Sequence, residues 1–209
     1  MAIQNISAFK TALVGGGARA NLYQVTCNSP AMLRGLPGLA GAGTKMQFLC
    51  RAAQLPASTM GVAPAFFRGR TVNLVGDRTF EPWVITVYND TDFQLRASME
   101  AWMRDQNAHE ENTGEQDPSQ YKADLHVEQL DKNGVVLYSY KFVGGFPTAV
   151  SAIDLAYDAN DQIEEFSIEW QYDYWESGTG DTAKNGGGDV TGEGKRGVVP
   201  TTGQALGPV

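Results

Sequence analysis

The sequence predicts a mainly β protein, an antiparallel β-sandwich or barrel with one flanking α-helix. Three observations favour this class. Apolar and polar residues alternate along several segments, as they do in strands that have one buried face. Aromatic residues make up 10% of the chain, and their rings pack well on pleated sheets. Only one segment has the apolar spacing of a good amphipathic helix.

Composition divides the 209 residues into three regions. Residues 1–20 form an N-terminal arm, and residues 21–176 form the β domain, with loop insertions at 28–44 and 56–70. Residues 177–209 form a glycine-rich C-terminal extension without an aromatic residue. A segment of that composition buries little apolar surface, so we expect its order to come from contacts with something else.

The predicted strands follow one another along the β domain, and residues that favour turns separate them. Gly76-Asp77-Arg78 is expected to connect two of the strands, and Asn133-Gly134 is a strong hairpin signal between two others. The last strand alternates most clearly, with one buried face and one acidic face. In chain order the predicted strands are 22–27, 45–53, 71–75, 83–88, 124–130, 135–143, 149–157 and 165–174.

The predicted helix starts after Thr91. Thr91 and Gln94 fit a capping box, in which each side chain caps the other's backbone, and Asp92 places a negative charge in the first turn. The helix is expected to end near Asn107, before a polar loop at 109–120. Its apolar stripe consists of Leu95, Met99, Trp102 and Met103.

Both loop insertions carry apolar side chains that we expect to be exposed. Apolar residues in segments that leave a compact domain are typical of surfaces buried against another chain. The alternative is that the insertions fold back onto their own domain. The candidate contacts between subunits are Leu33, Leu36, Leu39, Met60, Val62, Phe66 and Phe67.

No catalytic or metal-binding constellation is found in the sequence, so we expect no enzyme activity, metal or cofactor. The glycine run 15–17 matches neither a P-loop nor a dinucleotide fingerprint. His109 and His126 do not lie at metal-ligand spacing. Asp158 begins a stretch similar to a calcium loop, but Ile163 stands where the sharp turn needs glycine, which favours a plain hairpin turn.

The net charge of -8 disfavours tight nucleic-acid binding, although a phosphate-bearing partner that slides past is compatible with it. Cys27 and Cys50 are predicted to be buried free thiols. The N-terminal residues lack the pattern of a signal peptide, and no apolar stretch has the length of a membrane-spanning helix. We therefore expect no membrane contact and synthesis in a cytoplasm.

Several motifs occur in the order found in one protein family. RTVNLVGDRTFEPW is similar to a turn that links two strands of that family, and the Asn-Asp pair at 89–90 is similar to the lead-in to its single helix. Together these segments resemble the tail tube proteins of contractile-tailed bacteriophages, which are related to the tubes of contractile injection systems. The matching segments are 20–25, 70–83, 84–90, 142–148 and 166–176. The insert at 29–43 and the tail 177–209 are longer than the family pattern.

The resemblance implies a structural virion protein assembled in the host cytoplasm. Hexameric rings, whose inner strands join into one β-barrel, would stack into a tail tube for genome ejection. The implied partners are further copies of the chain, the tail sheath protein, baseplate and tail terminator proteins, and a tape measure protein in the lumen. DNA would pass without specific binding. The alternatives are a tube subunit of a DNA-free injection system or bacteriocin, and a monomeric ligand-binding β-sandwich.

Acidic residues on the predicted strands are candidates for the wall of such a lumen. Carboxylates facing the lumen would repel DNA phosphate and keep the channel free of bound DNA. A solvated outer face is the competing interpretation. The first candidate set is Glu165, Glu169 and Asp173, and the second is Asp124 and Glu128.

Overall fold

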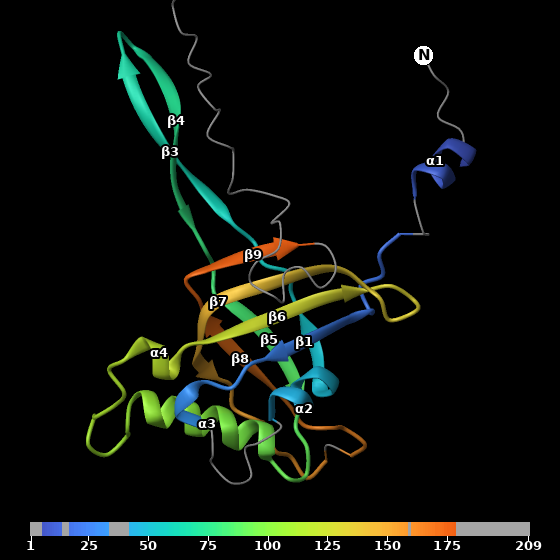
Figure 1. Ribbon diagram of the computed structural model, residues 1–209, viewed down its shortest axis with the longest axis vertical. Helices are drawn as coiled ribbons and strands as arrows, with labels where there is room; N and C mark the ends of the chain where they lie inside the picture. The colour runs from blue at the N-terminus through green and yellow to red at the C-terminus, as the bar shows by residue number, and fades with distance from the viewer. Residues whose placement is uncertain (1–5, 14–16, 34–41, 159, 179–209) are drawn as a thin grey trace, which may run out of the picture.

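The computed structural model describes residues 6–13, 17–33, 42–158 and 160–178, and its main body is a seven-stranded sheet (Figure 1). The strand order is β1-β6-β7-β8-β5-β2, with β9 also paired to β7, and all of these pairs are antiparallel. The strands are β1 (Tyr23–Cys27), β2 (Cys50–Ala53), β5 (Trp83–Tyr88), β6 (Ala123–Leu130), β7 (Val136–Val150), β8 (Glu165–Gln171) and β9 (Tyr174–Gly178). The mainly β prediction is confirmed.

The long strand β7 belongs to two layers. Its first part pairs with β6 and β9, whereas Phe146–Val150 pairs with β8. Gly144, between these parts, has a φ of 68°, a backbone conformation that favours glycine. The sheet therefore folds over at this strand into a β1-β6-β7-β9 layer and a β7-β8-β5-β2 layer.

The hydrophobic core lies between the two layers and under helix α3 (Gln94–Gln106). Trp83 of β5 stacks on Phe142 of β7, with ring centroids 4.3 Å apart. Leu95, Met99 and Trp102 of α3 are buried, as the predicted apolar stripe requires. The three other helices of the described residues are α1 (Ile6–Ala12), α2 (Ala42–Leu49) and α4 (Pro118–Tyr121), with a short 3-10 turn η2 (Ala31–Leu33).

Two predictions about local structure, one strand and one helix cap, were wrong in detail. The segment 45–53, predicted as one strand, continues α2 and then forms β2. Met46 is fully buried whereas Phe48 is 79% exposed, so the two residues do not share a face. The Thr91 capping box is not formed. Phe93 precedes α3 with a φ of 52°, and the Asp92 carboxylate accepts a hydrogen bond from the Gln94 backbone N–H instead.

The insertion at 56–70 was expected to be a loop, and the structure shows a β-hairpin instead. Strand β3 (Thr59–Phe67) pairs with β4 (Arg70–Thr79) in a separate two-stranded sheet. Its turn is Arg68-Gly69, with φ values of 46° and 81°, as tight hairpin turns require. The expected turn at Gly76-Asp77-Arg78 lies within β4. The strand predicted over 149–157 ends at Val150.

Candidate assembly surfaces

The β3–β4 hairpin leaves the body along the long axis of the molecule (Figure 1). Every residue of β3 is exposed, and both faces of the hairpin carry apolar side chains. A two-stranded hairpin is at best marginally stable in water, so this surface has the character of one that is buried in an assembly. The exposed large apolar side chains are Met60, Val62, Phe66, Phe67, Val72, Leu74 and Val75.

The apolar residues of β4 were not predicted to be exposed. Val72, Leu74 and Val75 were assigned to a strand of the domain body because the turn was placed at Gly76. The Arg68-Gly69 pair, between two apolar runs, is the signal that would have located the hairpin correctly.

In the described part of the other insertion, the candidate contact residue Leu33 is not exposed. Leu33 is only 6% exposed and belongs to the core, so the expectation that it is exposed was wrong. It lies in the short 3-10 turn η2, whose residues pack against α3 and α4. Leu36 and Leu39 lie outside the described residues.

The acidic face of β8 is the outer face of the β7-β8-β5-β2 layer. Glu165 and Glu169 alternate with the buried residues of this strand, and Glu169 lies opposite Val84 of β5. Arg51 of β2 forms an ion pair with Glu165, and this hydrogen bond raises the pKa of the Arg51 guanidinium. Asp173 lies beyond the end of β8, where Lys122 binds both of its carboxylate oxygens at 2.8 Å.

The second acidic set lies on the outer face of the other layer. Asp124 of β6 forms an ion pair of 2.8 Å with Lys141 of β7. Glu128 is only 1% exposed, and the Gln24 amide donates a hydrogen bond to its carboxylate. Because both layers face one core, their outer faces point away from each other. The two sets therefore cannot line the same lumen through these faces.

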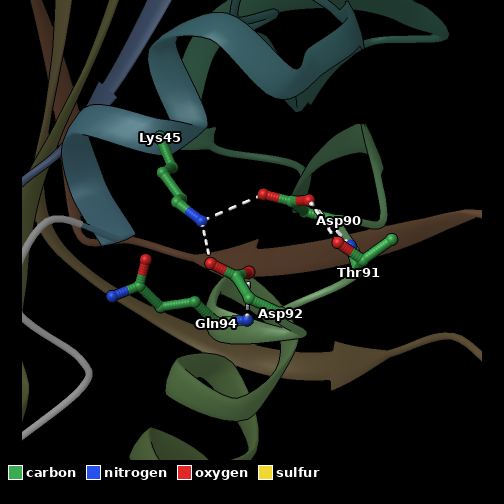
Figure 2. A network of polar contacts seen from close by, with 5 residues as sticks. All are labelled: Lys45, Asp90, Thr91, Asp92 and Gln94. Carbon is green, nitrogen blue, oxygen red and sulfur yellow. Dashed lines mark hydrogen bonds and ion pairs between the residues drawn. The ribbon is translucent and has the colours of Figure 1, made fainter.

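A polar network connects α2 to the start of α3 (Figure 2). The Lys45 ammonium lies 3.0 Å from Asp90 and also contacts Asp92. The carboxylates in turn accept backbone hydrogen bonds, Asp90 from Thr91 at 2.7 Å and Asp92 from Gln94 at 3.0 Å. Hydrogen bonds to Asp92 and Asp90 raise the pKa of Lys45, and the Lys45 contact lowers the pKa of Asp92.

The described residues hold no group of three or more side chains that could bind a metal ion. Cys27 and Cys50 are free thiols, as predicted, although only Cys27 is buried. Burial raises the pKa of the Cys27 thiol and raises that of Cys50 to about 11, so both are protonated at neutral pH. Within the described residues, no helix has the length and apolar composition needed to cross a membrane.

Comparison with known proteins finds similarity over most of the chain. A family model described as phage tail tube protein matches residues 18–177. The chain is 30% identical to tail tube protein gp19 of Enterobacteria phage T4 over 163 residues, 78% of this chain and 93% of that protein. It is 26% identical to the tail tube protein of Serratia phage KSP90 over 172 residues, 80% of this chain and 93% of that protein.

Solved structures share the fold at low sequence identity. A chain of the anti-feeding prophage baseplate has a TM-score of 0.55 at 12% identity, covering 78% of this chain and 95% of that chain. A chain of an extracellular contractile injection system, in a sheath–tube complex in the extended state, has a TM-score of 0.50 at 12% identity, covering 84% of this chain and 99% of that chain.

Proposed function

This chain belongs to the phage tail tube protein family, and we propose that its hexameric rings stack into the tube of a contractile tail, through which DNA enters the host. It is a structural component of the virion. We propose no catalytic role. The family match over residues 18–177 is the observation that carries this function. The DNA-free injection machine is supported only by likeness in fold, because those structures are 12–15% identical to this chain.

The topology of the β7-β8-β5-β2 layer supports closure into a ring. Its strands alternate in direction, so β2 at one edge runs antiparallel to β7 at the other. Neighbouring subunits of a ring are related by rotation about an axis roughly parallel to these strands. This rotation places β2 of one subunit beside Phe146–Val150 of the next, and the two strands are then antiparallel. A ring closed in this way has no free edges in the layer, which removes sites for aggregation.

We assign the lumen wall to the outer face of this same layer. Glu165 and Glu169 are its acidic residues. The second set suits a lumen less well, because Glu128 is buried and Asp124 is paired with Lys141. Asp173 of the first set is likewise paired, with Lys122, and Glu165 is paired with Arg51, so Glu169 is the carboxylate of this set without an ion pair among the described residues. Carboxylates on a narrow channel wall repel phosphate, so DNA would slide through without binding.

The exposed hairpin supports the stacking of rings. Met60, Val62, Phe66 and Phe67 would be buried against a subunit of the neighbouring ring. The outer circumference would contact the tail sheath protein, and the ends of the tube would contact baseplate and tail terminator proteins. A tape measure protein would occupy the lumen before DNA does.

Electron microscopy of the purified full-length protein over a concentration series tests the proposal. Rings or hollow tubes are expected at high concentration, and a resolved tube should place Glu165 and Glu169 toward the axis. A tube with these carboxylates on its outer surface would disprove the lumen assignment alone. A protein that remains monomeric at every concentration, even when mixed with preformed tail ends as nuclei, would contradict the tube function.

A further inference from the structure

The loop between β7 and β8 lies at the end of the molecule opposite the hairpin (Figure 1). Its described residues, 151–158 and 160–164, include three apolar side chains that face solvent: Leu155, Tyr157 and Ile163. Isolated exposed apolar residues are common on protein surfaces, but three within nine positions at one pole form a candidate contact surface. The sequence pattern predicts a strand for part of this segment and a plain turn for the rest, so the exposed loop is a finding of the structure.

Hydrogen bonds to the domain fix both ends of this loop. At one end, the Ser151 carbonyl accepts from the Arg96 guanidinium at 3.1 Å, and the Ser151 backbone N–H donates to Ser167 at 2.9 Å. At the other end, Asn89 binds the backbone and the carboxylate of Glu164, at 2.8 and 2.9 Å. The loop is thus anchored while its apolar residues remain exposed, an arrangement that lowers the entropic cost of binding a partner.

The loop is strongly acidic. Residues 151–164 contain three Asp and one Glu and no Lys, Arg or His, so their net charge is -4. Asp154, Asp158 and Asp161 are exposed, and within the described residues none of them forms an ion pair. The cation that contacts the loop, Arg96, is already paired with Glu100 at 2.8 Å.

The hairpin at the opposite end has the complementary charge. Residues 59–79 contain three Arg and one Asp, so their net charge is +2. Arg68 and Arg70 flank the turn at the tip beside the exposed rings of Phe66 and Phe67, and the Arg68 guanidinium lies 5.3 Å from the centre of the Phe67 ring. Among the described residues, neither Arg68 nor Arg70 has an ion-pair partner.

We propose that the tip of the β3–β4 hairpin of one subunit docks on the 151–164 loop of a second copy in the next ring, a contact that rests on the tube function proposed above. Phe66 and Phe67 pack against Leu155 and Tyr157, while the tip arginines pair with the loop aspartates. Each subunit presents the hairpin at one end and its acceptor at the other, so the contact is head-to-tail and propagates from ring to ring.

The dimensions of the hairpin suit this role. The nine residues of β3 rise about 3.3 Å each, so the hairpin is about 30 Å long. Opposite charges at the two ends also give the stack a direction, because two like ends repel each other. The occupant of the loop is therefore a second copy of this chain, whose tip matches the loop in both apolar and charged groups.

Charge reversal with rescue tests the contact in the full-length protein. One variant carries Arg68→Glu and Arg70→Glu, and another carries Asp154→Lys and Asp158→Lys. Each variant alone is expected to lower the fraction sedimenting as tubes by about tenfold, because like charges then meet at every copy of the contact. Combining all four changes restores attraction and is expected to restore tubes to within about twofold of the unmodified protein. Lys132→Glu, an exposed change in the β6–β7 turn, is the control and should leave tubes unchanged.

A disulfide trap measures the proximity directly. Tubes of a chain with Phe67→Cys and Leu155→Cys, once oxidised, should give a ladder of covalently linked chains in denaturing gels, and neither single variant should do so. The absence of both rescue and ladder, in a protein that still forms tubes, would overturn the docking assignment and leave the tube function intact. An unmodified protein that forms neither rings nor tubes, even with nuclei, would contradict the tube function itself.

Discussion

Trp102 of α3 meets Trp170 of β8 edge to face, with ring centroids 5.3 Å apart and ring planes at 71°. Both side chains are almost completely buried, and the Trp102 indole N–H donates a hydrogen bond of 2.8 Å to the Tyr121 carbonyl. The pair joins the helix to the layer that carries Glu165 and Glu169. The geometry of the proposed lumen wall therefore depends on a helix packed on its opposite face.

Replacement of Trp102 by Ala is expected to destabilise the fold by about 3–5 kcal/mol, since it leaves a cavity beside Trp170 and removes the hydrogen-bond donor for Tyr121. Trp102→Phe retains most of the ring and should cost clearly less. Urea unfolding of the unassembled protein, followed by tryptophan fluorescence and by circular dichroism, measures both values. Equal stability of Trp102→Ala and the unmodified protein would show that the helix is not held by this contact.

Gly144, where β7 passes from one layer to the other, should tolerate a side chain less well than other glycines with a positive φ. Its φ is 68°, and a Cβ at this position would overlap the Asp173 carboxylate that Lys122 binds. Gly134 is a matched control, with a φ of 79° and no atom within 4 Å of a Cβ. We expect Gly134→Ala to cost about 1 kcal/mol, and Gly144→Ala to cost about 1 kcal/mol more, because the Asp173 side chain must move away and give up its ion pair with Lys122. Thermal unfolding of the two variants, measured under the same conditions, gives the comparison. An equal loss of stability in both variants would refute the prediction.

The sequence predicted the body of this fold better than its projections. Strands β5 and β8 were located because a clean alternation of core and solvent residues is a local property, readable from Trp83–Tyr88 and from Glu165–Gln171. The hairpin was misplaced because its strands are exposed on both faces, so alternation gives no signal along them. The turn residues Arg68-Gly69 are the sequence signal that indicates the hairpin.

The candidate site shows a similar limit. Sequence reasoning found the acidic positions of both layers, but it could not establish that Glu169 and Glu128 point in opposite directions, since strand pairing across the chain decides this. It also treated Leu33 as exposed, because the helices that cover it come from distant segments. Ion pairs such as Asp173 with Lys122 depend on the same long-range arrangement.

The Lys45 network should make the junction of α2 and α3 sensitive to extremes of pH. The folded-state pKa of Asp92 lies below its ordinary value of 3.8, so its stabilising effect is complete above that pH and is lost as the pH falls below it. The folded-state pKa of Lys45 lies above 10.5, so its effect is present below that pH and is lost as the pH rises through the raised value.

Lys45→Gln removes the positive charge, so the dependence of stability on pH should become weaker at both acidic and alkaline pH. Stability at neutral pH should change little, because solvent screens the interactions of these exposed side chains. Unfolding midpoints measured from pH 3 to pH 11 give the comparison. Lys132→Gln, an exposed lysine outside any ion pair of the described residues, is the control and should keep the unmodified profile. Identical profiles for Lys45→Gln and the unmodified protein would contradict the role of the network.

The apolar hairpin should contribute to assembly and very little to folding. Phe66 is 79% exposed, so Phe66→Ser removes almost no buried surface from the isolated subunit and should change its unfolding free energy by less than about 0.5 kcal/mol. If the Phe66 side chain is buried between stacked hexamers, the same change should abolish long tubes. Val135 in the β6–β7 turn is 60% exposed and lies outside both the hairpin and the β2 edge, so Val135→Ser is a control for the loss of an exposed apolar side chain. Tube lengths by electron microscopy, with urea unfolding of the unassembled chains, separate the two effects. Tubes shortened equally by both changes would indicate general loss of surface hydrophobicity, whereas tubes shortened by Phe66→Ser alone would assign the effect to the hairpin.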